Sequence, residues 1–104
     1  MREVLPTVRE WRAGGTPVAV ATVVGVDRSA PRQPGAVMAV GGDGRVAGSV
    51  SGGCVEGAVF ELAQHVLDDG RPRLVTYGIS DEQAFSVGLT CGGTIEVFVE
   101  RLDW

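Results

Sequence analysis

Two glycine-rich segments each carry one of the two cysteines of the chain, and these residues are the best suited to chemistry. The segments read GSVSGGCVE at 48–56 and GLTCGG at 88–93. A thiolate is a nucleophile and a soft metal ligand. Glycine fills no core and is placed where a backbone must turn sharply or come close to something. The pattern is therefore consistent with two tight turns, or with a cradle of backbone donors that holds Cys54 and Cys91.

A helix is predicted to follow directly after Cys54. Apolar residues recur at helical spacing from Val55 to Leu67, and Gly70 with Pro72 gives a normal C-terminal stop. The N-terminus of a helix presents free N–H groups and a partial positive charge, which bind anions and favour a thiolate. Glu56 fits two roles here: a base or hydrogen-bonding partner, or a first-turn carboxylate that favours the helix dipole.

Several familiar catalytic and phosphate-binding patterns are absent from the sequence. The chain has no lysine, so no G-x-x-x-x-G-K-[ST] loop can be formed, and no G-x-G-x-x-G motif follows a strand. His65 is the only histidine. One histidine and two cysteines are too few for a convincing zinc site, and a thiol protease or a Ser-His-Asp triad lacks its base. We therefore expect no enzyme of these classes.

The composition indicates one small cytoplasmic domain. The chain has 104 residues and a formal net charge of −4, which argues against nucleic acid as a partner. No apolar run is long enough to span a membrane, and charged residues interrupt the N-terminal stretch where a signal peptide would lie. In a reducing compartment both cysteines are expected to be thiols.

The remaining elements predict an α/β fold: a single small domain with a mixed, mostly antiparallel sheet of about five strands and packing helices. The loop 27–35 contains two arginines, and it is either a solvated connector or a place where Arg28 or Arg32 grips an anion. A short helix is predicted to begin at Ser80. The other expected elements are a helix at 2–12, a strand at 18–26, a hairpin of 36–40 with 45–50, and strands at 73–77 and 94–100.

Four segments, taken together and in order, resemble the N-terminal domain of the XdhC/CoxI family. They are SAPR with PGA at 29–36, GSVSGGCVE at 48–56, YGISDE at 77–82 and GLTCGG at 88–93. The resemblance covers nearly the whole chain, and the two Gly-Cys motifs together make it specific. Members of this family are maturation factors for molybdenum hydroxylases such as xanthine dehydrogenase and carbon monoxide dehydrogenase. They bind the molybdenum cofactor and help to deliver its sulfurated form to the apo-enzyme.

The resemblance implies a site and its ligand. Cys54 and Cys91 would contact the molybdenum of a bound molybdopterin cofactor or handle its sulfur, and Arg32 would be the preferred candidate among the arginines, because it lies within a matching motif. The backbone cradle would consist of Ser51, Gly52, Gly53, Gly92 and Gly93.

Three functions follow from this resemblance. The first is a cofactor-binding chaperone that is not an enzyme. The second is a thiol sulfur carrier that forms a persulfide at Cys54 or Cys91. The third is a docking module whose glycine loops are only turns.

Many members of the family continue into a second, Rossmann-like domain, which residues 1–104 do not contain. We therefore expect a homodimer, or a separate Rossmann-domain partner chain, in addition to the hydroxylase apo-enzyme.

Overall fold

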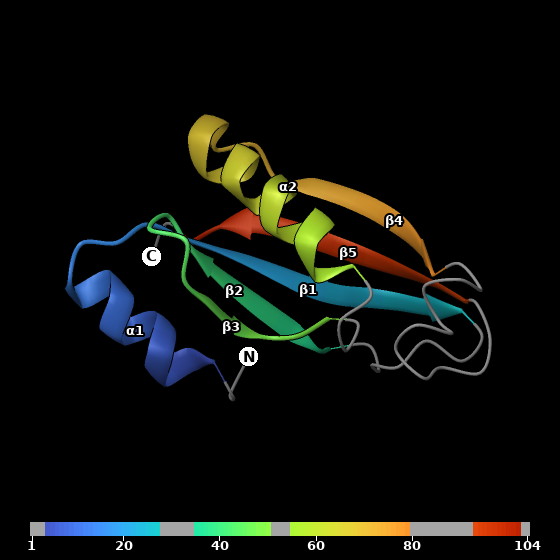
Figure 1. Ribbon diagram of the computed structural model, residues 1–104, viewed down its shortest axis with the longest axis horizontal. Coiled ribbons are helices and arrows are strands. Elements are labelled where there is room, and N and C mark those ends of the chain that lie inside the picture. The colour runs from blue at the N-terminus through green and yellow to red at the C-terminus, as the bar shows by residue number, and fades with distance from the viewer. Residues whose placement is uncertain (1–3, 28–34, 51–54, 80–92, 103–104) are drawn as a thin grey trace.

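The computed structural model describes residues 4–27, 35–50, 55–79 and 93–102, which form one antiparallel sheet and two helices (Figure 1). The predicted α/β fold with about five strands is confirmed, and every strand pairing in the described residues is antiparallel. The elements in chain order are α1 (Leu5–Ala13), β1 (Val18–Asp27), β2 (Val37–Gly41), β3 (Val46–Gly48), α2 (Glu56–Asp69), β4 (Arg73–Ile79) and β5 (Gly93–Arg101).

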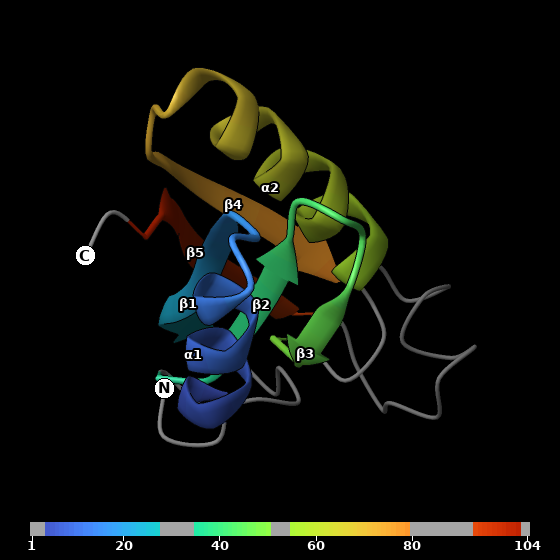
Figure 2. The same ribbon diagram turned by 90° about the vertical axis from the view of Figure 1, so that its left-hand side faces the viewer.

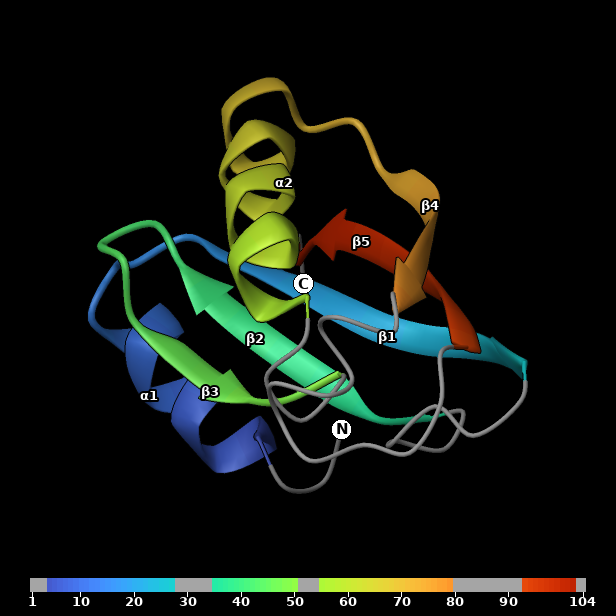
Figure 3. The ribbon, with the colours of Figure 1, turned by 45° about the vertical axis from the view of Figure 1, so that its right-hand side comes forward.

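The strands lie in the order β3-β2-β1-β5-β4, so β1 is central, as its continuous apolar sequence predicts (Figure 3). β1 pairs with β2 over its first half, Val18 to Thr22, and with β5 from Ala19 to Asp27. The register with β5 shifts between Val23 and Gly25, which marks a β-bulge. The bulge turns Val24 outward, where 49% of the residue is exposed. The expectation that this run is buried on both faces therefore holds only up to Val23.

The two helices cover opposite faces of the sheet (Figure 2). α2 lies on the face formed by alternate residues of β1 and β5, and its buried residues Val59, Ala63 and Val66 belong to the same cluster as Ile95 and Val97. This alternation agrees with the period of two that the sequence of β5 shows. The larger of the two hydrophobic cores therefore lies between α2 and the sheet.

The second core lies between α1 and the other face of the sheet. Val8 and Trp11 of α1 are buried there with Val18 and Val20 of β1. The turn between β2 and β3 closes over this helix, since the Arg45 guanidinium carbon lies 4.9 Å from the centre of the Trp11 ring. α1 thus packs against the sheet through the apolar face that the sequence of 2–12 predicts.

The helix boundaries follow the signals in the sequence. α2 ends at Gly70, which adopts a left-handed φ of 71° and donates its N–H to the Val66 carbonyl, a common C-terminal stop. α1 begins at Leu5, with a proline in its first turn, so it is shorter at its N-terminus than the predicted 2–12. The short helix predicted to begin at Ser80 lies outside the described residues.

Candidate functional site

Most of the predicted site residues lie outside the part of the chain that the structure describes. Gly93 is the exception: it is the first residue of β5 and pairs with Ile79 of β4. The others fall in three segments whose flanking residues are described: Arg32 in 28–34, Ser51, Gly52, Gly53 and Cys54 in 51–54, and Cys91 and Gly92 in 80–92. The position of the site therefore has to be derived from the residues that flank these segments.

These flanking residues lie at one end of the sheet (Figure 1). β1 ends at Asp27 opposite Thr94, at the start of β5, and β4 ends at Ile79 opposite Gly93. β2 begins and β3 ends on the same side, with Met38 paired to Gly48, although β1 and β5 extend several residues further. The three segments that contain Arg32, Cys54 and Cys91 are consequently attached to the same end of the sheet.

The entry to the Cys54 segment is fixed by a glycine that no other residue can replace without strain. Gly48 has a φ of +82°, and a Cβ at this position would lie 2.2 Å from the carbonyl oxygen of Val37. The chain therefore leaves β3 in a conformation that L-residues with a side chain rarely adopt. Of the residues nearest to 51–54, Val50 before it is 0% exposed and Val55 after it is 6% exposed. Both belong to the core beneath α2.

Glu56 joins the two sides of this segment. It is the first residue of α2, and its Oε2 accepts a hydrogen bond of 2.7 Å from the Ser49 hydroxyl and one of 2.9 Å from the Val50 N–H. Of the two roles open in the sequence, the hydrogen-bonding partner is the one observed, and the carboxylate also occupies the first turn of the helix. The spacing of seven residues between Ser49 and Glu56 carries no sequence signal, because the contact depends on the turn at Gly48.

The start of α2 combines an N-cap residue without a side-chain cap and a carboxylate in the first turn. Its N-cap residue is Val55, whose side chain makes no capping hydrogen bond to the helix. The backbone N–H groups of the first turn therefore lack a side-chain cap from this residue and keep their partial positive charge. The negative charge of the Glu56 carboxylate lies in the same first turn, so it weakens the attraction of the helix start for a second anion. Stabilisation of a thiolate at Cys54 by the helix stays a prediction.

Tyr77 lies near the same end of the sheet, on the face covered by α2. Its side chain is half-buried and packs against the larger core. Burial raises the pKa of its phenol group above the ordinary value. Tyr77 is therefore a packing residue.

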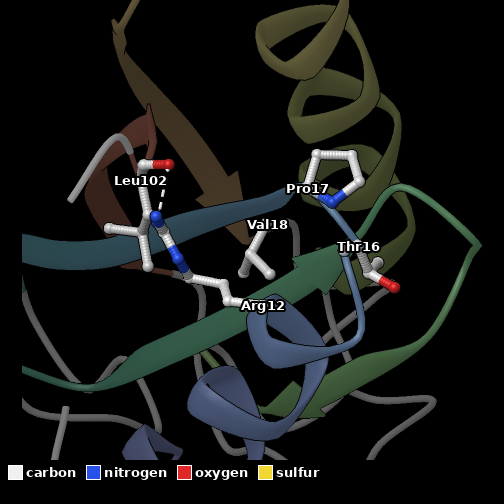
Figure 4. A pocket seen from close by; sticks show the side chains of 6 residues that line it. Arg12, Thr16, Pro17, Val18 and Leu102 are labelled. Carbon is white, nitrogen blue, oxygen red and sulfur yellow. Dashed lines mark hydrogen bonds between the residues drawn. The ribbon is translucent and has the colours of Figure 1, made fainter.

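A pocket of about 230 Å³ lies at the opposite end of the sheet (Figure 4). It is lined by Arg12 of α1, by residues 15–18 at the start of β1, and by Leu102, which follows β5. The Arg12 guanidinium donates a 2.8 Å hydrogen bond to the Leu102 carbonyl oxygen across this pocket. The pocket is separate from the end of the sheet that carries the predicted site residues, and we assign it no ligand.

The described residues contain no group of three or more His, Cys, Asp or Glu side chains that could hold a metal ion. Both cysteines lie outside those residues, so the predicted molybdenum contacts at Cys54 and Cys91 stay predictions. Neither α1 nor α2, the helices of the described ranges, is long and apolar enough to traverse a lipid bilayer.

Comparison with known proteins agrees with the resemblance seen in the sequence. The sequence model of the XdhC and CoxI family matches residues 11–78, a range that includes Arg32 and Cys54 but ends before Cys91. The chain is 37% identical over 101 residues to the molybdenum cofactor insertion chaperone PaoD of Escherichia coli (strain K12), covering 97% of this chain and 31% of PaoD. It is 38% identical over 85 residues to a probable xanthine dehydrogenase subunit from Bacillus subtilis (strain 168), covering 80% of this chain and 26% of that protein.

A solved structure shares the fold. The crystal structure of a xanthine dehydrogenase from Bacillus halodurans superposes with a TM-score of 0.78 and 34% sequence identity, over 94% of this chain and 30% of that one. The chain thus spans less than a third of the length of each of these three proteins.

Proposed function

Because the chain belongs to the XdhC and CoxI family, we propose that it takes part in the maturation of a molybdenum hydroxylase, as a chaperone that binds the molybdenum cofactor and assists its insertion into the apo-enzyme. The hydroxylase would be of the xanthine dehydrogenase or carbon monoxide dehydrogenase type. The name of the E. coli relative, a molybdenum cofactor insertion chaperone, supports this role. The cofactor is cargo, so the protein need not catalyse a reaction.

The observation that carries the proposal is the attachment of three segments to one end of the sheet. Arg32, Cys54 and Cys91 belong to segments whose flanking residues lie at that end (Figure 1). In the sequence these residues are far apart, and the strand order β3-β2-β1-β5-β4 connects their segments to a common place. Residues that bind the same ligand must lie close together, and attachment to the same end of the sheet is consistent with this.

The types of these residues suit the cargo. Cys54 and Cys91 would offer thiolates, which are soft ligands appropriate to a metal that is bound by sulfur. Arg32 and the N-terminus of α2 would bind the phosphate, since a guanidinium forms two parallel hydrogen bonds and a helix start presents free N–H groups. Ser51, Gly52, Gly53, Gly92 and Gly93 would let the backbone approach the cofactor closely.

Further parts of the assembly belong to the proposal. The relatives are more than three times as long as this chain, so a Rossmann-like domain would act with it, on the same or a separate polypeptide. We also expect a homodimer and a cytoplasmic location, where two free thiols persist. Leu74 on the edge strand β4 is 61% exposed, more than the other exposed large hydrophobic residues of the described ranges, Val24 and Val46. Light scattering of the purified protein would give its mass in solution.

A reconstitution assay tests the proposed function. An apo-enzyme of the xanthine dehydrogenase type is incubated with molybdenum cofactor in the presence or absence of this protein, and the hydroxylase activity gained is measured over time. A chaperone accelerates the gain and protects the cofactor before insertion, and Cys54→Ala reduces both effects. In a separate incubation with a persulfide donor, a sulfur carrier would instead take the outer sulfur of the donor onto one cysteine thiolate and release the donor as a thiol, and the resulting persulfide would be visible by mass spectrometry. Unchanged activity gain with the wild-type protein would contradict the proposal.

A further inference from the structure

The strand β4 forms an open edge of the sheet. It lies last in the strand order, and among the described residues it pairs with β5 alone (Figure 3). Natural proteins commonly protect such an edge with charged residues or proline, but residues 74–78 read LVTYG and contain neither. At the opposite edge, β3 has only three residues and ends at Gly48, whose φ is +82°. β4 is therefore the edge of this sheet that is suited to accept a further strand.

Two hydrogen bonds of β1 establish which backbone groups of β4 point outward. The Val23 N–H donates to the Ala36 carbonyl, on the β2 side, whereas the Val18 carbonyl accepts from the Leu102 N–H, on the β5 side. The direction of these groups alternates from residue to residue along a strand. The registers of β1 with β5 and of β5 with β4 carry this alternation across the sheet. The N–H and C=O groups that point away from β5 are consequently those of residues 74, 76 and 78.

A second copy of this chain is the partner that suits this edge. An antiparallel strand pair is symmetric, so β4 can pair with the same strand of a second copy about a two-fold axis. Each copy has a formal net charge of −4, which opposes contact over most of the surface. Residues 74–78 carry no charge, and the neighbouring Arg73 is paired with Asp69 of its own chain. Two copies can thus meet along β4 without placing like charges opposite each other.

We propose that β4 is the interface of a homodimer in which the two copies form one continuous sheet. This inference rests on the homodimer of the proposed function and does not depend on cofactor binding. Thr76 lies on the two-fold axis, because this register lets residues 74, 76 and 78 of both copies exchange hydrogen bonds. A register centred on Val75 would place residue 78 opposite Pro72, which has no N–H to donate.

The side chains of β4 fit this register. Leu74, which is 61% exposed, lies opposite Gly78 of the second copy, where no side chain blocks it. On the other face of the sheet, the half-buried Val75 lies opposite Tyr77 of the second copy. Pairs of an aromatic and a β-branched residue stabilise neighbouring antiparallel strands. The pairing therefore covers the most exposed of the large hydrophobic residues in the described ranges.

Thr76→Pro tests the interface, because it removes an N–H that points away from β5. Proline is tolerated on an edge strand where the missing N–H faces solvent, so this variant is expected to fold, which circular dichroism checks. Thr76→Ala keeps the N–H and is the matched control. In sedimentation equilibrium, we expect the wild type and Thr76→Ala at twice the mass of the chain. Thr76→Pro is expected to weaken dimerisation by about tenfold or more.

Amide hydrogen exchange of the wild type, followed by NMR over a dilution series, tests the alternation without any variant. The amides of Leu74, Thr76 and Gly78 are expected to exchange about tenfold or more faster once dilution separates the two copies. Those of Val75 and Tyr77 donate to β5 and are expected to change by less than about threefold.

The results that would contradict the interface are distinct from those that concern the cofactor. A Thr76→Pro dimer as tight as that of the wild type, or exchange at Leu74 and Thr76 that dilution leaves unchanged, would overturn the interface and leave the homodimer intact. A wild type that is monomeric at every concentration would overturn both and leave the edge open to a strand of another protein. Neither result bears on cofactor insertion, which the reconstitution assay tests separately.

Discussion

Gly48 packs against Val37 so closely that its backbone leaves no room for a side chain. A Cβ at Gly48 would lie 2.2 Å from the Val37 carbonyl oxygen and 2.9 Å from a methyl carbon of Val4. The φ of Gly48 is +82°, which is unfavourable for other residues. This contact ties the end of β3 to β2 just before the segment that carries Cys54.

Gly48→Ala should therefore destabilise the protein strongly. The clash with backbone atoms and the positive φ together predict a loss of about 3 kcal/mol or more in the free energy of unfolding, measured by urea denaturation. Gly57→Ala is the control, because a Cβ there meets nothing within 4 Å and the residue lies inside α2. It should stabilise the protein by about 0.5–1 kcal/mol. Similar effects of the two changes would be evidence against the described turn.

Substitution of Val59 tests how much the core beneath α2 contributes to the free energy of unfolding. Its side chain is fully buried against the sheet, so Val59→Ala removes two methyl groups from a packed interior. We expect a loss of about 2 kcal/mol in the free energy of unfolding. Val46 on β3 is 46% exposed, and Val46→Ala should change stability by no more than about 0.5 kcal/mol. A smaller loss for Val59 than for Val46 would contradict the placement of α2.

The hydrogen bonds of Asp69 predict a specific pH dependence of the stability of the protein. Its carboxylate accepts a 2.9 Å hydrogen bond from the Arg71 N–H and a further one from the Arg73 guanidinium, and these lower its pKa from the ordinary value of 3.8. A carboxyl group whose pKa is lower in the folded state stabilises the protein at pH values above its ordinary pKa. This stabilisation is lost as the pH falls through the lowered pKa. The wild type should therefore be more stable than Asp69→Asn at neutral pH, and the two should converge as the pH falls below the lowered pKa of Asp69.

Denaturation midpoints of the two proteins across this pH range provide the measurement. Asp68→Asn is the control, since the described part of the chain gives Asp68 no hydrogen-bond donor. A constant difference between wild type and Asp69→Asn from neutral to acidic pH would show that the hydrogen bonds of Asp69 do not depend on its charge.

The sequence predicted most of the fold because strand and helix periods are local. The β-branched run beginning at Val18 became the central strand, and Gly70 ended α2 where its conformational freedom predicts. The exposure of Val24 was not predictable, since a continuous apolar run has no alternation to show where a bulge interrupts it. Such a detail depends on pairing with β5, which lies about seventy residues further along the chain.

The candidate site was predictable in its residue types but not in its arrangement. The Gly-Cys segments are visible in the sequence, whereas the attachment of three segments to one end of the sheet depends on the order of five strands. The role of Glu56 required the turn at Gly48 to bring Ser49 and Val50 to the start of α2. Relations of this kind arise from tertiary structure and leave no periodic pattern.

We propose that this chain binds the molybdenum cofactor, with Cys54 and Cys91 as the candidate ligands of the metal. The most direct test is anaerobic binding of purified molybdenum cofactor to the wild type, Cys54→Ala and Cys91→Ala, with the bound molybdenum measured. We predict binding by the wild type and a loss of at least about tenfold in affinity for Cys54→Ala, because a soft ligand of the metal is removed. Equal binding by all three proteins, or no binding by the folded wild type, would contradict the account.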